Sequence, residues 1–227
     1  MGMTDRLLGS GRTADVFALD DTWVLRRYRD GTDATEETAV MAYLSEHGYP
    51  VPPVRPAAPG SPHTDLVMGR LTGPTMAEAA MRGVLTPEEA AVILARLLQT
   101  LHALPARSST SPADRVLHLD LHPENVILTP EGPVVIDWST TEEGPPGLDW
   151  AMSALILAEV AVSGRPEAAG SRVALATLLT DAAVDVRATA KHHLAEARAR
   201  RAANPTLGED EVRWLEAAGE LVLEMHQ

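Results

Sequence analysis

The sequence contains no cysteine, and its 19 basic residues include a single lysine, Lys191. Without thiols the chain has no disulfide framework, thiolate metal site or cysteine nucleophile, so its chemistry must use oxygen or imidazole groups. No uninterrupted run of about 18 apolar residues occurs, which argues against a membrane-spanning helix. The opening residues also lack the charged and then apolar pattern of a secretion signal. We therefore expect a soluble, cytoplasmic protein with no membrane partner.

The composition is that of a folded, acidic protein. Its 227 residues are 45% hydrophobic, which is enough to bury a core in one large domain or two small lobes. The chain carries 32 acidic and 19 basic residues, a formal net charge of −13. Such a charge repels nucleic acid and favours, weakly, a cationic small-molecule partner.

Strand and helix signals divide the chain. The first 70 residues carry strand signals, with one helix expected over 33–47 and a Pro-rich stretch after it. We predict strands over 15–19, 22–28 and 65–68. Further along, Thr86 opens a capping box with proline at the first helical position. From Gly147 the pattern is helical almost to the end.

This division predicts an α+β protein with a β-rich lobe at residues 1–70 and a helical lobe at residues 71–227. Only a short region follows Asp149 to bind a substrate. We expect its basic run, Arg198, Arg200 and Arg201, to form an exposed helix face, and its many glutamates to be solvated.

A predicted hairpin carries the most informative side chains. If the apolar runs 126–129 and 133–136 pair antiparallel, Asn125 and Asp137 are equidistant from the turn and lie opposite each other, about 4.5–5.5 Å apart. Their oxygen atoms are ligands that Mg²⁺ prefers. Asp120 stands on the loop just before them. A carboxylate beside a magnesium site is what phosphoryl transfer requires.

The pattern H-x-D-x-x-x-x-N, followed by a hairpin and an apolar-apolar-Asp, resembles the catalytic and metal-binding segments of the protein-kinase-like superfamily. The segments HLDLHPENVIL and VVIDW resemble the motifs of the aminoglycoside phosphotransferase and choline kinase branch. The resemblance implies a two-lobed kinase-like fold, with ATP and Mg²⁺ as cofactors. It makes Asp120 the catalytic base, Asn125 and Asp137 the metal ligands, and His118 a brace for the loop. Simple packing would explain His118 and His122 equally well.

Weaker signals of the same resemblance lie in the first lobe. Gly9, Ser10 and Gly11 resemble the glycine-rich loop over the ATP phosphates, although Ala14 replaces the third glycine and an ordinary hairpin turn is the alternative. Arg26 stands where the family has a phosphate-binding lysine, an exchange that is not conservative. Its ion-pair partner would be Glu37 or, alternatively, Glu36.

The segment from Asp65 to Gly73 resembles the strand and hinge that receive adenine, which places Val67 and Met68 against the nucleotide. Gly69 stands where the family often has an acidic residue. Asp149 resembles an aspartate that braces the catalytic loop, although an N-cap would explain it equally well.

The leading hypothesis is an ATP-dependent kinase of a small-molecule hydroxyl, such as an aminoglycoside or another natural product. A nucleotide-binding pseudokinase scaffold and a regulatory module without nucleotide are the rivals. The missing lysine and the short C-terminal region favour the pseudokinase, whereas the set of Asp120, Asn125 and Asp137 argues against both rivals.

Overall fold

The computed structural model describes residues 6–56, 58–181, 184–205 and 207–225, with the side chains of 181–191 left out. The chain divides into two compact units. Of the described residues, the first unit holds those up to Gly73 together with Ile127–Ser139. The second holds Pro74–Val126 and the residues from Thr140 onward. The sequence predicted a single boundary, at residue 70. In the structure the chain returns once to the first unit, with residues Ile127–Ser139.

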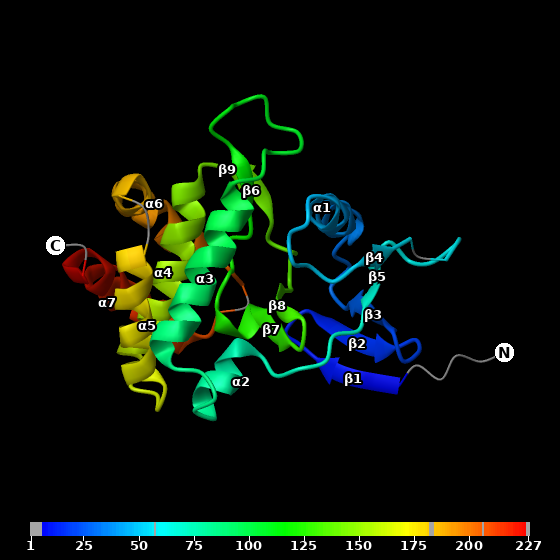
Figure 1. The fold of residues 1–227 in the computed structure, drawn as a ribbon, viewed down its shortest axis with the longest axis horizontal. Helices are drawn as coiled ribbons and strands as arrows, with labels where there is room; N and C mark the ends of the chain where they lie inside the picture. The colour runs from blue at the N-terminus through cyan, green and yellow to red at the C-terminus, as the bar shows by residue number, and fades with distance from the viewer. Residues whose placement is uncertain (1–5, 57, 182–183, 206, 226–227) are drawn as a thin grey trace. The chain divides into compact units, whose positions relative to one another are not determined.

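In the first unit, the described residues form an antiparallel five-stranded sheet of order β1-β2-β3-β5-β4 (Figure 1). Tight turns join β1 to β2 and β2 to β3. Strands β2 and β3, which pair antiparallel, lie where strands were predicted over 15–19 and 22–28. The strands are β1 (Arg6–Ser10), β2 (Ala14–Ala18), β3 (Trp23–Tyr28), β4 (Val54–Arg55) and β5 (Asp65–Gly69).

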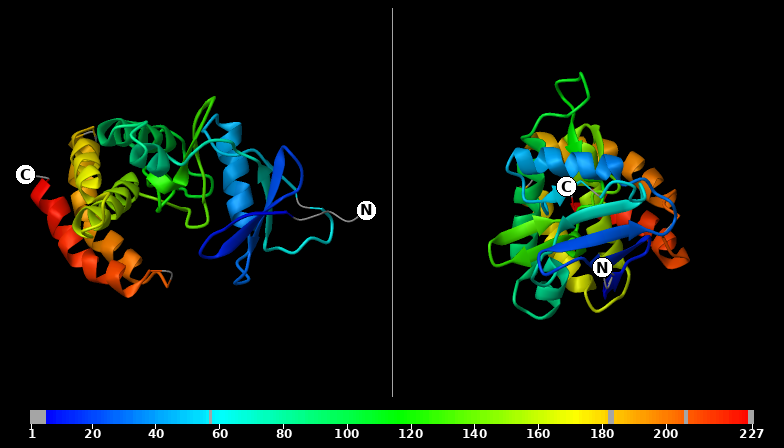
Figure 2. Two further views of the ribbon diagram at one scale, coloured as in Figure 1. Left: turned by 90° about the horizontal axis from the view of Figure 1, so that it is seen from below. Right: turned by 90° about the vertical axis from the view of Figure 1, so that its right-hand side faces the viewer.

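Helix α1 (Thr35–Glu46) lies on one face of this sheet (Figure 2). It buries Val40, Met41 and Leu44, which recur at helical spacing, and it also buries Glu37. The helix predicted over 33–47 is therefore confirmed, with ends shorter by two residues and by one residue. Since a buried glutamate needs a partner, α1 carries a polar contact into an apolar interface.

The second unit is mainly helical. Helix α3 begins at a capping box, where the Thr86 hydroxyl accepts the N–H of Glu89 and the Glu89 carboxylate accepts the N–H of Thr86. The helices are α2 (Met76–Met81), α3 (Pro87–His102), α4 (Pro146–Val162), α5 (Ala168–Asp181), α6 (Val184–Ala202) and α7 (Glu209–Met225). The α+β architecture, β-rich first and helical later, is confirmed.

Helix α4 is the centre of this unit and packs against α5, α6 and α7. Its residues from Gly147 to Glu159 are all buried, as expected of a helix that is apolar on every side. A strand pair, β6 (Arg115–Leu117) with β9 (Glu142–Gly144), leads into it. Among the described residues, no helix is both long enough and apolar enough to cross a membrane.

The predicted hairpin after residue 125 forms, with a different turn. Strand β7 (Val126–Thr129) pairs with β8 (Gly132–Val135), so the turn contains only Pro130 and Glu131. The predicted strand 133–136 therefore lies one residue too late. The predicted symmetry of Asn125 and Asp137 about the turn is therefore wrong. With a two-residue turn, the residue equidistant with 125 is 136.

Candidate active site

The loop that follows β6 is braced by Asp149. This carboxylate, fully buried in the first turn of α4, accepts the backbone N–H groups of His118 (3.0 Å) and Leu119 (2.7 Å). His102 Nε2 lies 3.0 Å from the same carboxylate. The cap of α4 is Pro145 and not Asp149. The structure therefore assigns Asp149 to the loop rather than to an N-cap.

Electrostatics keep Asp149 ionised at the centre of the unit. Burial alone raises the pKa of Asp149, but the hydrogen bond to His102 and electrostatic interactions with His102 and His118 outweigh burial and lower it. Leu119 adopts φ 63°, a conformation that costs energy in a non-glycine residue. The two hydrogen bonds from the loop backbone to Asp149 hold this conformation in place.

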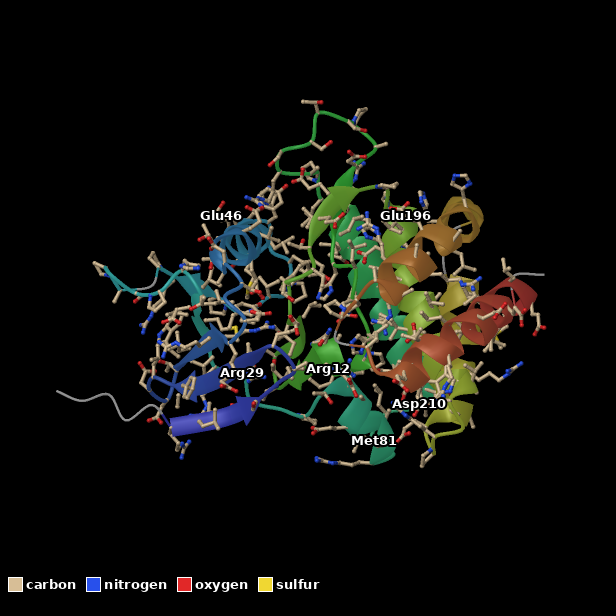
Figure 3. The ribbon with its side chains drawn as sticks, turned by 180° about the vertical axis from the view of Figure 1, so that it is seen from behind. Arg12, Arg29, Glu46, Met81, Glu196 and Asp210 are labelled. Atoms are coloured by element: carbon tan, nitrogen blue, oxygen red, sulfur yellow. The ribbon has the colours of Figure 1, made fainter. Side chains whose placement is uncertain are left out.

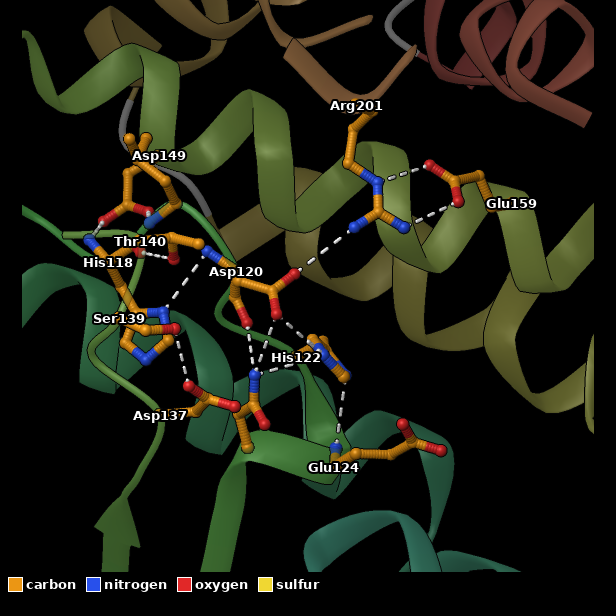
Figure 4. Close-up of polar contacts among 12 residues, drawn as sticks. His118, Asp120, His122, Glu124, Asp137, Ser139, Thr140, Asp149, Glu159 and Arg201 are labelled. Atoms are coloured by element: carbon orange, nitrogen blue, oxygen red, sulfur yellow. Dashed lines mark hydrogen bonds and ion pairs between the residues drawn. The ribbon is translucent and has the colours of Figure 1, made fainter. Parts of the chain in front are cut away.

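His118 is a buried side chain of the same loop. Its Nδ1 accepts the N–H of Asp120 (3.2 Å), and its carbonyl accepts the Thr140 hydroxyl (2.8 Å) (Figure 4). It thus makes contacts within the loop and with Thr140, and its bracing role stays a prediction.

Asn125 holds Asp120 through its side-chain amide. Its Nδ2 donates to the Asp120 carbonyl (2.9 Å) and to Asp120 Oδ2 (3.2 Å), and it lies 3.2 Å from His122 Nε2. His122 in turn caps the short helix η1 (Pro123–Asn125). With Nδ2 committed in this way, Asn125 Oδ1 has no hydrogen-bond partner among the described residues.

Arg201 corrects the sequence analysis. It lies near the end of α6 and is buried, instead of joining an exposed basic face. Its guanidinium forms a fork with Glu159 of α4 (Nε–Oε1 3.0 Å, Nη2–Oε2 2.8 Å) and donates from Nη1 to Asp120 Oδ1 (3.3 Å). Arg200, next to it, does lie at the surface, paired with Glu142 and Glu196. Figure 3 marks Glu196 on α6.

The surroundings of Asp120 favour its charged form. Burial alone raises the pKa of Asp120, but hydrogen bonding to His122 and electrostatic interactions with His122, His118 and Arg201 outweigh burial and lower it. Asp120 is therefore an ionised carboxylate, which can accept a hydrogen bond from a hydroxyl group.

The first unit has its own charged centre. Arg26 of β3 is buried and pairs with Glu37 Oε1 of α1 (3.2 Å) and with Asp137 Oδ1 (2.7 Å). Tyr28 donates its hydroxyl to Glu37 Oε2 (2.5 Å). Glu36 is exposed, so the predicted partner of Arg26 is Glu37. Burial alone lowers the pKa of Arg26, but Asp137 and Glu37 outweigh it and keep the guanidinium charged.

Arg27 lies on the opposite face of β3. Its guanidinium binds both carboxylate oxygens of Asp65, each at 2.7 Å. Neighbouring strand residues point to opposite faces, so Arg26 and not Arg27 faces Glu37 and Asp137.

Asp137 follows β8 in a strained conformation, φ 64°. Its Oδ1 accepts from Arg26 and from the Ser139 hydroxyl (2.8 Å), while Oδ2 has no hydrogen-bond partner among the described residues. The next residue, Trp138, is fully buried and donates its backbone N–H to Glu37 Oε1 (3.2 Å). Arg26, Glu37 and Trp138 together hold Asp137 in place.

The glycine-containing turn is the hairpin between β1 and β2, which carries Ser10 and Gly11. Arg29 lies beside it and donates to the carbonyls of Gly11 (2.7 Å) and Arg12 (2.8 Å), and it also pairs with Asp15 (Figure 3). Gly9 lies within β1, with no atom near enough to restrict a side chain there. Arg29 thus fixes the carbonyl side of the turn.

Val67 and Met68 lie in β5, between β3 and β4. Val67 is buried and Met68 is half-buried. A side chain at Gly69 would meet the Pro53 ring at 2.8 Å, which explains why no acidic residue stands there. At Gly73, φ is 145° and a Cβ would lie 2.1 Å from the Leu128 carbonyl oxygen, so only glycine fits.

Comparison with protein families identifies the chain. The model of the phosphotransferase enzyme family, APH, matches residues 4–115 and 107–177, more than half of the sequence. The chain belongs to this family. No curated protein matches this phosphotransferase with significant similarity.

Solved structures share the fold of this phosphotransferase. A thermostable mutant of aminoglycoside phosphotransferase APH(4)-Ia aligns with TM-score 0.67 and 13% identity over 96% of this chain and 93% of that one. The streptomycin-ATP complex of APH(2")-IIa aligns with TM-score 0.59 and 15% identity, covering 96% and 92%. Amicoumacin kinase hAmiN, in complex with AMP-PNP, Ca²⁺ and Ami, aligns with TM-score 0.55 and 13% identity, covering 96% and 87%.

Sequence reasoning missed Glu159 and Arg201 in this phosphotransferase. The available signal was Glu159 itself, because an acidic residue inside the apolar run of α4 must find a cationic partner when buried. Nothing in the sequence indicated which arginine that partner is.

Proposed function

We propose that this phosphotransferase is a kinase that transfers the γ-phosphate of ATP to a hydroxyl of a small molecule, with Mg²⁺. The observation that carries the proposal is the state of Asp120, an ionised carboxylate fixed by Asn125 on a loop braced by Asp149. Family membership supports the reaction class.

In the proposed reaction, Asp120 orients the acceptor hydroxyl and takes its proton as the oxygen attacks the phosphorus. His118 and Asp149 act on the loop and not on the substrate. The hydrogen bonds of Asn125 fix where the carboxylate stands, so the base needs little rearrangement when the acceptor binds.

The side chains of Asn125 and Asp137 each offer an oxygen atom to a hard cation. Asn125 Oδ1 and Asp137 Oδ2 are both free of hydrogen bonds among the described residues, and oxygen is the donor that Mg²⁺ selects. We propose these two residues as the metal ligands. Mg²⁺ bound there would neutralise charge on the phosphates. The described residues contain no cluster of three or more His, Asp or Glu side chains suited to a metal, so phosphate oxygens and waters would complete the coordination.

The nucleotide would contact the first unit. In this proposal Arg26 binds phosphate, and its ion pair with Glu37 holds the guanidinium in position. The turn from Gly9 to Gly11 covers the phosphates. Val67 and Met68 would border the adenine. The acceptor is proposed to be a natural product with a free hydroxyl, because related folds include streptomycin and amicoumacin kinase complexes.

A nucleotide-binding scaffold without catalysis is the second candidate. One observation favours it: Arg26 Nη2 lies 2.7 Å from Asp137 Oδ1, so an arginine occupies one oxygen of the proposed metal ligand. Such a protein would bind nucleotide and leave it intact.

Turnover separates the two candidates. Purified protein is incubated with Mg·ATP, alone and with streptomycin or amicoumacin, and ADP release is measured. Thermal unfolding reports binding in parallel, since a ligand at 100 times its dissociation constant stabilises by about 2.7 kcal/mol. ADP release supports the kinase. Binding without release with any acceptor supports the scaffold, and no nucleotide binding contradicts both.

A further inference from the structure

Asp120 is contacted at both carboxylate oxygens by different parts of the second unit. Asn125, on the same loop, donates to Oδ2 (3.2 Å). Arg201, 81 residues further along the chain, donates to Oδ1 (3.3 Å) (Figure 4). Two contacts from different directions fix the plane of a carboxylate, whereas one contact leaves it free to rotate.

Arg201 is itself held rigidly. Its fork with Glu159 uses two parallel N–H groups, which fixes the position and the plane of the guanidinium. Both side chains are buried, and Glu159 lies on α4, the central helix of the unit. The chain thus provides a buried support that reaches from α4 through α6 to Asp120.

A buried ion pair is an expensive way to obtain stability, because desolvation of the two charges offsets their attraction. A purely structural contact between α4 and α6 would be as stable with apolar side chains. The direction of Arg201 Nη1 toward Asp120 therefore indicates a role in the site.

We propose that Arg201 is a positioning residue, which Glu159 holds in place and which sets the orientation of the Asp120 carboxylate for the acceptor hydroxyl. The inference rests on the proposed kinase function. Arg201 acts through Asp120, and its contribution belongs to the turnover step, not to nucleotide binding.

The first test compares Arg201→Met with the matched control Arg200→Met. Both remove one arginine of α6, but Arg200 contacts Glu142 and Glu196 at the surface and not Asp120. With Mg·ATP, alone and with streptomycin, Arg201→Met should lower kcat by about tenfold to a hundredfold, because small displacements of a catalytic group cost this much. KM for ATP should stay within about twofold. Arg200→Met should match the parent in both, and Arg201→Lys should recover part of kcat.

The second test separates positioning from stability. Arg201→Met alone leaves Glu159 buried without its partner, so its Tm should fall. The double variant Arg201→Met/Glu159→Leu removes both charges, and its Tm should return toward that of the parent. Its kcat should remain as low as in the single variant, because Asp120 still lacks its contact at Oδ1.

Recovery of kcat together with Tm in the double variant would overturn the inference, since Arg201 would then act only on folding. So would a kcat for Arg201→Met equal to that of Arg200→Met. No turnover by the parent protein would overturn the proposed function and this inference with it. Parent turnover with unaffected Arg201 variants would overturn the inference alone.

Discussion

Each unit of the molecule holds a buried arginine between a glutamate and an aspartate. Arg26 lies between Glu37 and Asp137, and Arg201 lies between Glu159 and Asp120. The arginines expose only 8% and 9% of their surface, and the glutamates 5% and 4%. The aspartates are more open, with 36% and 29% of their side chains exposed.

The two centres differ in where their hydrogen bonds go. In the first unit the glutamate gathers three partners, Arg26, Tyr28 and the N–H of Trp138. In the second unit both oxygens of the Glu159 carboxylate accept hydrogen bonds from Arg201, its one hydrogen-bond partner among the described residues. Burial raises the pKa of Glu37 and of Glu159, against the opposing effect of their arginines. The first centre is a hub, in which Glu37 holds Arg26, Tyr28 and Trp138 in place. In the second centre Glu159 holds Arg201 in place, and Arg201 contacts Asp120.

Asp120→Asn is expected to give the largest effect. Turnover of Mg·ATP should fall by about 10²-fold or more, because an amide cannot take the proton of the acceptor. Folding and Mg·ATP affinity, followed by thermal unfolding and calorimetry, should stay near those of the parent. Asp210→Asn, an exposed site on α7, is the control. Equal activity of Asp120→Asn and parent would remove Asp120 from the mechanism.

Asp137→Ala tests the aspartate of the first centre. Loss of a metal ligand should weaken Mg·ATP binding by about tenfold or more, since even partners of ligands are worth 10- to 100-fold. Calorimetry measures the ATP affinity with and without Mg²⁺. If Asp137 binds the metal, the parent should bind ATP more tightly with Mg²⁺, and the variant should lose this gain. An unchanged difference would contradict the metal assignment.

Arg26→Ala should weaken ATP by about tenfold and adenosine hardly at all, because only ATP carries the phosphates that a charge-assisted hydrogen bond would reach. Arg26→Lys should restore part of the loss, since the charge returns without the fork. Arg27→Ala is the control, because Arg27 pairs with Asp65 on the opposite face. A loss of ATP binding in Arg27→Ala would refute the role of Arg26. So would unchanged ATP binding in both alanine variants.

Tyr28→Phe gives the smallest effect and tests the hub. It removes the hydrogen bond to Glu37 Oε2 and nothing else. The free energy of unfolding in urea should fall by about 1 kcal/mol, while turnover stays within about twofold. A loss of ATP affinity as large as that of Arg26→Ala would show that the hub positions the nucleotide.

Local signals in the sequence predicted most of the fold. The capping box at Thr86 and the apolar spacing in α1 specify their helices through contacts within a few residues. The turn of the β7–β8 hairpin was misplaced by one residue because Pro130 and Gly132, which flank Glu131, are both typical turn residues. Such a shift changes which residues pair, although both strands were predicted.

The sequence named candidate site residues from a contiguous motif and, for Arg26 and Glu37, from the family resemblance. Asp120 and Asn125 lie five residues apart, and their contact follows from the loop itself. Arg201 contacts Glu159 over 42 residues and Asp120 over 81. Helical spacing cannot separate Arg201 from Arg198 and Arg200 when the packing of α6 on α4 is unknown. The roles assigned to these residues stay predictions until turnover is measured.

The return of Ile127–Ser139 to the first unit has a consequence for synthesis on the ribosome. Arg26 takes one of its two carboxylates from Asp137, Glu37 receives the N–H of Trp138, and the Pro50 carbonyl receives the N–H of Val135. Domains normally complete folding as they emerge, starting from the N-terminus. Here the sheet of the first unit lacks these partners until residues 135–138 have been translated. A nascent chain halted before residue 135 would hold the buried pair of Arg26 and Glu37 without its remaining contacts.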